Sequence, residues 1–147
     1  MFVGSGTFFS VAMLLGIILS VVLHEAVMES VYADSKTFWR PGFLGAEETE
    51  GLWVFWGWLI HKCVFALSVG VLYALCRENL HVRPWRKGVY VGLLSWLMIA
   101  ATYLGLATAL ALPVSIWISW MIDYFVSAVL AGGAMGSMVE RFADSSG

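Results

Sequence analysis

The sequence predicts an all-α integral membrane protein in which four transmembrane helices form an up-down bundle over one domain, residues 1–147. Two properties of the composition indicate this fold class. Hydrophobic residues make up 61% of the chain and charged residues 12%, with a mean hydropathy of +0.85, whereas soluble domains carry about 25% charged residues. The chain also holds eight Trp and nine Phe, and aromatic rings collect at bilayer interfaces. A lipid bilayer is therefore the expected surrounding.

Four apolar segments have the length of a membrane span, which takes about 20 residues of helix. We expect spans at residues 8–28, 53–76, 88–112 and 114–139. Pro113 precedes the fourth span, in line with the preference for proline in a first helical turn. The first segment is not expected to be a cleaved signal peptide, because no Lys or Arg precedes it. In addition, His24, Glu25 and Glu29 separate it from the cleavage-like triplet at 31–33.

The loops differ in charge, and this difference predicts the orientation. Residues 29–52 form an acidic outer loop, and its Phe38, Trp39 and Phe43 predict a short segment lying on the headgroups. Residues 77–87 form a basic turn with four Lys or Arg, in which Pro84 is expected to break any helix. By the positive-inside rule both termini are cytoplasmic. We expect a bacterial inner (cytoplasmic) membrane protein with an outer aromatic belt of Trp39, Trp53, Trp56, Trp58, Trp117 and Trp120.

The hydropathy pattern places Lys62 deep within the second span. It lies ~13–15 Å into the second span at about 1.5 Å of rise per residue, where a charge costs on the order of 2.5–3.5 kcal/mol. Polar residues at comparable depth would offset that cost. Opposite charges attract strongly in a low-dielectric medium, so Lys62 is expected to pair with Asp123 or Glu25. The expected buried polar cluster consists of His24, Glu25, His61, Lys62 and Asp123, with Ser119 and Ser127 on the face of Asp123.

The sequence leaves three roles open for this cluster. The first is structural, in which the cluster locks the helices into one register. The second is proton-coupled or small-ion transport, because ionisable groups within a membrane mark ion paths. The third is a cofactor site, in which His24 and His61 ligate a b-type haem or one of them holds a porphyrin pigment. Apart from this third role, no cofactor and no metal site are expected.

Small residues recur every four positions in the second and fourth spans, a pattern that lets helix backbones approach closely in lipid. The two spans align without a gap, with Trp58 on Trp120. This alignment suggests a parallel duplication of a two-helix hairpin. Both helices are expected to pack tightly, and any uncovered part would serve self-association or docking to a larger complex. The two ladders are Ala66, Gly70 and Ala74, and Ala128, Gly132 and Gly136.

Motifs of common enzyme classes are missing from the sequence. There is no nucleophile–base pair, phosphate-binding glycine loop or CxxC, and His24-Glu25 lacks the second histidine of HExxH. Nucleic-acid binding is not expected, because the net charge is -2 and the basic turn is explained by topology. The expected function is that of a non-catalytic membrane protein, either an accessory subunit of a membrane complex or a homo-oligomer.

Overall fold

A computed structural model describes residues 2–23 and 48–144, without the side chains of residues 20, 21, 23, 48–55 and 58. Its helices are α1 (Phe2–Leu23), α3 (Glu48–Cys76), α4 (Pro84–Ala109) and α5 (Val114–Asp144), and the short 3₁₀ helix η3 (Arg77–Asn79) follows α3. Each α-helix contains a segment long and apolar enough to cross a membrane. The predicted fold class is confirmed: the chain is an all-helical, multi-pass membrane protein.

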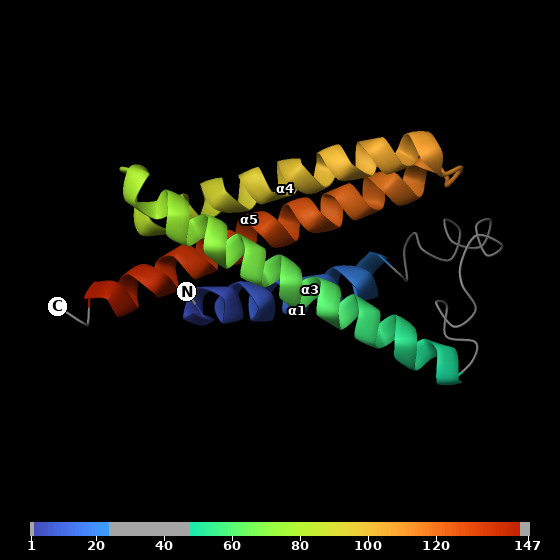
Figure 1. The fold of residues 1–147 in the computed structure, drawn as a ribbon, viewed down its shortest axis with the longest axis horizontal. Coiled ribbons are helices and arrows are strands. Elements are labelled where there is room, and N and C mark those ends of the chain that lie inside the picture. The colour runs from blue at the N-terminus through green and yellow to red at the C-terminus, as the bar shows by residue number, and fades with distance from the viewer. Residues whose placement is uncertain (1, 24–47, 145–147) are drawn as a thin grey trace.

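The four helices run alternately up and down and pack as a bundle around α5 (Figure 1). α4 lies antiparallel beside α5, and α1 packs against α5 as well. α3 crosses this assembly and diverges from the α4–α5 hairpin toward its own N-terminal end. The N-terminus, the C-terminal end of α5 and η3 lie at one end of the bundle, which we call the η3 end. The turn at residues 110–113 lies at the opposite end.

Several helix ends differ from the expected ones. α1 begins at Phe2 rather than at residue 8, because Gly4 and Ser5 are buried by the neighbouring helices. No helix runs through Pro84, as expected, but α4 begins at Pro84 itself rather than at residue 88. It occupies the first turn of α4, where its missing N–H costs no hydrogen bond. α5 continues to Asp144 rather than ending at residue 139. The interfacial segment expected in the loop 29–52 and the end of the first span at residue 28 lie outside the described residues.

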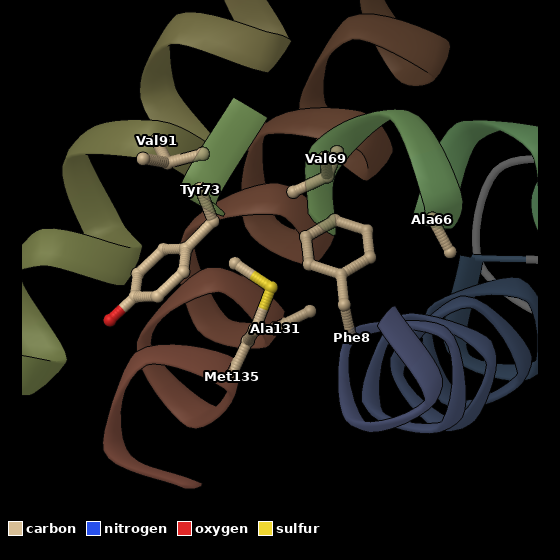
Figure 2. Packing of buried hydrophobic residues seen from close by; sticks show 7 residues of the cluster. All are labelled: Phe8, Ala66, Val69, Tyr73, Val91, Ala131 and Met135. Carbon is tan, nitrogen blue, oxygen red and sulfur yellow. The ribbon is translucent and has the colours of Figure 1, made fainter. Parts of the chain in front are cut away.

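The core lies where the four helices meet, toward the η3 end. Phe8 of α1 is 1% exposed and points between Val69 of α3 and Met135 of α5 (Figure 2). Its ring also meets Phe65 edge to face, with the ring centroids 5.7 Å apart. The full cluster consists of Phe8, Ala66, Val69, Tyr73, Val91, Ala131 and Met135. One side chain of α1 therefore joins α3 to α5.

The closest helix contact is the backbone contact between α4 and α5. A Cβ atom at Gly88 would collide with the carbonyl oxygen of Gly132, and one at Gly92 would collide with that of Ala128. Gly136 lies in the same way against the carbonyl of Pro84. The predicted α5 ladder is thus covered within the chain. Sequence analysis did not single out its partner, Gly88 and Gly92, although these glycines carry the same four-residue spacing.

The α3 ladder is covered in part by α1. Ala66 and Gly70 are buried, and a Cβ atom at Gly70 would collide with the hydroxyl of Ser5. Ala74 is exposed, because it lines a pocket of about 170 Å³ at the η3 end. The small-residue ladder of α3 faces α1, and the ladder of α5 faces α4 in the same way. The suggested duplication stays a prediction.

Candidate functional site

Lys62 and Tyr124 form the centre of the polar region that the sequence singled out. α3 places the Lys62 Nζ 4.2 Å from the centroid of the Tyr124 ring on α5. An ammonium over an aromatic face is attracted by the ring quadrupole, more strongly where water is excluded. Lys62 is half-buried and Tyr124 is buried. The Lys62 side chain is therefore held between α3 and α5 by an aromatic face.

Asp123 lies next to Tyr124 on α5 and is half-buried. The Ser127 hydroxyl lies near its carboxyl group, and Lys62 attracts this group electrostatically. Its Oδ1 atom is fully buried and has no hydrogen-bond partner among the described residues. The Lys62 ammonium therefore does not donate to this oxygen. An unsatisfied buried oxygen is uncommon in native proteins and calls for an explanation.

The expected buried cluster of charges is not found in the described part of the chain. His61 is exposed, because consecutive residues of a helix are rotated by about 100° and Lys62 takes the direction of α5. The ring of His61 meets only the edge of Tyr124, at 6.4 Å between centroids. The Ser119 hydroxyl donates to the Ile116 carbonyl of its own helix, at 3.1 Å, and is not linked to Asp123. The other two members, His24 and Glu25, lie outside the described residues.

Several aromatic side chains of the described residues pack around Tyr124. Tyr124 packs edge to face against Phe65 of α3 and Tyr103 of α4, with centroids 6.0 Å and 5.7 Å away. Tyr103 also meets Trp117 and Trp120. Trp117, expected in an interfacial belt, is only 7% exposed, so that expectation is wrong for this residue.

Of the remaining belt residues, Trp56 is exposed and Trp120 is half-buried. Trp39 and the side chains of Trp53 and Trp58 lie outside the described set. The aromatic residues near the 110–113 turn therefore act in part as a core between α4 and α5.

A second feature is a groove of about 570 Å³ between α3 and α4. It forms because the two helices diverge from the η3 end (Figure 1). Val71, Leu75 and Met98 are exposed along its walls, so the groove opens toward lipid. The lining residues are His61, Phe65, Ser68, Val69, Val71, Leu72 and Leu75 of α3, and Ser95, Met98, Ile99 and Thr102 of α4. Sequence analysis had assigned His61 to the charged cluster and had not identified the groove.

A third feature is a polar network at the η3 end that ties three helices together. The Tyr73 hydroxyl of α3 donates to Glu140 Oε1 of α5 at 3.2 Å, and Lys87 Nζ of α4 lies 3.7 Å from the same oxygen. Sequence analysis assigned neither residue to a site, and Lys87 entered it only as one of the four basic residues of the turn 77–87. No pattern along the chain signals that they meet, because they lie on different helices.

Metal and haem chemistry finds little support in the described residues. They contain no group of three or more His, Cys, Asp or Glu side chains that could hold a metal ion. Lys62, Phe65 and Ala66 face α1 across a space of only about 10 Å³. The haem or pigment site expected between His24 and His61 stays a prediction, because His24 is not described.

Comparison of the chain with protein-family models, with curated proteins and with solved structures found no match.

Proposed function

We propose that the protein is a non-catalytic subunit of a larger membrane assembly, and that the α3–α4 groove receives a transmembrane helix of a partner. The observation that carries this proposal is the size and chemistry of the groove, about 570 Å³. A subunit of this kind needs an uncovered concave surface within the membrane, and the groove is such a surface.

The polar groups of the groove walls favour an apolar occupant. The hydroxyls of Ser68, Ser95 and Thr102 donate to the carbonyls four residues earlier in their own helices, at 2.9, 2.8 and 3.0 Å. Each hydroxyl donor is therefore already satisfied. Association of helices in lipid depends on close packing rather than on expulsion of water. An apolar helix with a complementary shape would replace loosely packed lipid chains here.

The α4 wall offers small residues beyond the groove as well. Thr102, Gly105 and Ala109 follow Met98 at steps of three and four residues, and all are exposed. A Cβ atom at Gly105 would meet nothing within 4 Å. In contrast to Gly88 and Gly92, these residues are not covered by α5. Small residues on an open face allow a partner helix to approach the α4 backbone closely.

The mass of the protein in its native membrane tests this proposal. The single chain has a mass of 16.2 kDa, and we expect extraction with surrounding lipid to yield a larger, discrete complex. Met98→Trp and Gly105→Leu fill the groove and its extension, so both are expected to release the chain as a monomer. Ile118→Trp is the matched control, because Ile118 is exposed on α5 away from the groove. A wild-type protein that is extracted as a monomer would refute the proposal.

The expected membrane and orientation belong to the same proposal. The η3 end carries the start of α1, the end of α5, Arg77 of η3 and Arg83 just before α4. With this end in the cytoplasm of a bacterial cell, the basic residues lie on the side that the positive-inside rule favours. The groove would then open toward the outer leaflet.

A second candidate function is proton-coupled or small-ion transport past Lys62 and Asp123. One observation favours it, the buried Asp123 Oδ1 atom without a hydrogen-bond partner among the described residues. Ionisable groups in the membrane commonly mark such paths. Purified protein in liposomes is expected to move protons or a small cation under a gradient, and Asp123→Asn to stop this flux. Equal flux in empty liposomes would rule the function out.

A further inference from the structure

The pocket at the η3 end, of about 170 Å³, lies between α1, α3 and α5. Gly4 of α1 and Met135 and Val139 of α5 form its apolar part. On the α3 side, Gly70 and Ala74 carry no more than a methyl group and leave the space unfilled. The volume corresponds to roughly five or six water molecules at ~30 Å³ each. The pocket therefore has room for a small polar group.

The polar part of the lining carries charges of both signs. Arg77 and Glu78 are consecutive residues of η3, and both line the pocket. The Arg77 guanidinium presents N–H donors in a planar fork that matches a phosphate. The Glu78 carboxylate accepts hydrogen bonds, so it suits an ammonium group. A ligand that carries a phosphate and an ammonium would complement both side chains.

The start of α1 adds a second preference for a phosphate. Gly4 lies in the first turn of α1 (Phe2–Leu23) and lines the same pocket. The N–H groups of a first helical turn have no acceptor within the helix, and the helix dipole gives this end a positive partial charge. Arg77 and the start of α1 therefore favour an anionic group in one place.

The pocket lies at the level where the helices leave the hydrocarbon layer. Arg77 is near the end of the apolar segment Leu59–Asn79. Trp85, at the start of α4 and at the same end of the bundle, is 46% exposed. The Arg86 guanidinium lies 5.2 Å from the centroid of its ring. Because exposed Trp residues are typical of the headgroup level, the phosphates available to this pocket are those of phospholipids.

We propose that the pocket at the η3 end binds the headgroup of a phospholipid with an ammonium and a phosphate, such as phosphatidylethanolamine. The phosphate accepts hydrogen bonds from Arg77, the ammonium donates to Glu78, and the glycerol part lies against Ala74. The bound lipid fills the space between α1, α3 and α5 at this membrane face. The inference goes beyond both proposed functions, since the pocket shares no lining residue with the α3–α4 groove and contains neither Lys62 nor Asp123.

Native mass spectrometry of the full chain in detergent, titrated with one phospholipid at a time, tests the proposal. We expect one phosphatidylethanolamine to bind about tenfold more tightly than phosphatidylglycerol, a difference of ~1.4 kcal/mol, because phosphatidylglycerol has no ammonium for Glu78. Inorganic phosphate should not displace the lipid, since it has neither an ammonium nor an apolar part. Equal binding of the two lipids, or displacement by inorganic phosphate, overturns the proposal.

Two substitutions separate the roles of the charges. Arg77→Gln should weaken the binding of phosphatidylethanolamine about tenfold, again ~1.4 kcal/mol. Glu78→Gln should remove the preference over phosphatidylglycerol without weakening the binding of phosphatidylglycerol. Arg83→Gln is the matched control, because Arg83 is exposed at the same end and does not line the pocket. An equal loss in Arg77→Gln and Arg83→Gln would indicate a general attraction to basic residues and would contradict a site in the pocket.

A third substitution tests the space itself. Ala74→Leu puts a larger side chain into the pocket and should abolish the binding of phosphatidylethanolamine. Ala101→Leu is its control, since Ala101 is exposed on α4 and does not line the pocket. Circular dichroism of both variants checks that the helices are intact. Unchanged lipid binding by a folded Ala74→Leu variant overturns the proposal.

Discussion

The backbone of Gly88 on α4 lies directly against the backbone of Gly132 on α5. Each glycine would direct an added Cβ atom into the carbonyl oxygen of the other. A second tie between these helices is the Trp96 indole, which donates to the Met121 carbonyl at 3.0 Å. The α4–α5 hairpin is therefore fixed by contacts that tolerate no extra atom at Gly88 or Gly132.

Gly88→Ala is expected to destabilise the protein for this reason. Overpacking of a tight contact commonly costs about 1–3 kcal/mol, and here the colliding atom is backbone, which cannot rotate away. The free energy of unfolding can be measured by titration with a denaturing detergent in mixed micelles. Gly16→Ala serves as the control, because a Cβ atom at Gly16 meets nothing within 4 Å. Equal stability of the two variants would argue against the close α4–α5 contact.

Tyr73→Phe is expected to lower the free energy of unfolding by about 0.5–1.5 kcal/mol, the usual net value of one hydrogen bond. The lost bond is the one from the Tyr73 hydroxyl to Glu140. The same substitution in a Glu140→Met background should cost close to nothing, because the acceptor is already gone. Tyr90→Phe is the matched control, since Tyr90 is exposed on α4. An identical loss in both backgrounds would show that Tyr73 and Glu140 are not coupled.

The orientation can be checked with single cysteines. Arg83, which precedes α4, and Ser115, in the first turn of α5, are exposed at opposite ends of the bundle. In a variant with Cys63 and Cys76 replaced by alanine, Ser115→Cys should react with a membrane-impermeant thiol reagent in intact cells. Arg83→Cys should react only after lysis, because the positive-inside rule places its turn in the cytoplasm. The reverse pattern of labelling would invert the proposed topology.

The purified protein is expected to show no Soret absorption band. α1 and α3 pack directly through Ser5 and Gly70, and the space beside Lys62 and Ala66 measures about 10 Å³. A porphyrin beside Lys62 and Ala66 would have to separate α1 from α3 there. A Soret band in protein expressed with ample haem, lost in His61→Ala, would instead support the cofactor role considered for His24 and His61.

The sequence determined which segments cross the membrane. Backbone hydrogen bonds within a bilayer must be satisfied by the protein itself. A long apolar segment therefore forms an α-helix there. α3 ends at Cys76 and α5 begins at Val114 directly after Pro113, and both ends follow from local signals. The four-residue ladder likewise marked Gly132 and Gly136 as a face for close packing before any partner was known.

Only the tertiary structure decided which face meets which neighbour. Lipid tails are as apolar as Leu side chains, so hydropathy does not distinguish a surface that faces lipid from one that faces another helix. For this reason the sequence did not pair Gly132 with Gly88, bury Trp117 or reveal the groove between α3 and α4. The depth of Lys62 in the membrane predicted that its charge needs a partner, but the sequence did not identify that partner. The crossing of α3 over α5 decided that the Tyr124 ring would hold it.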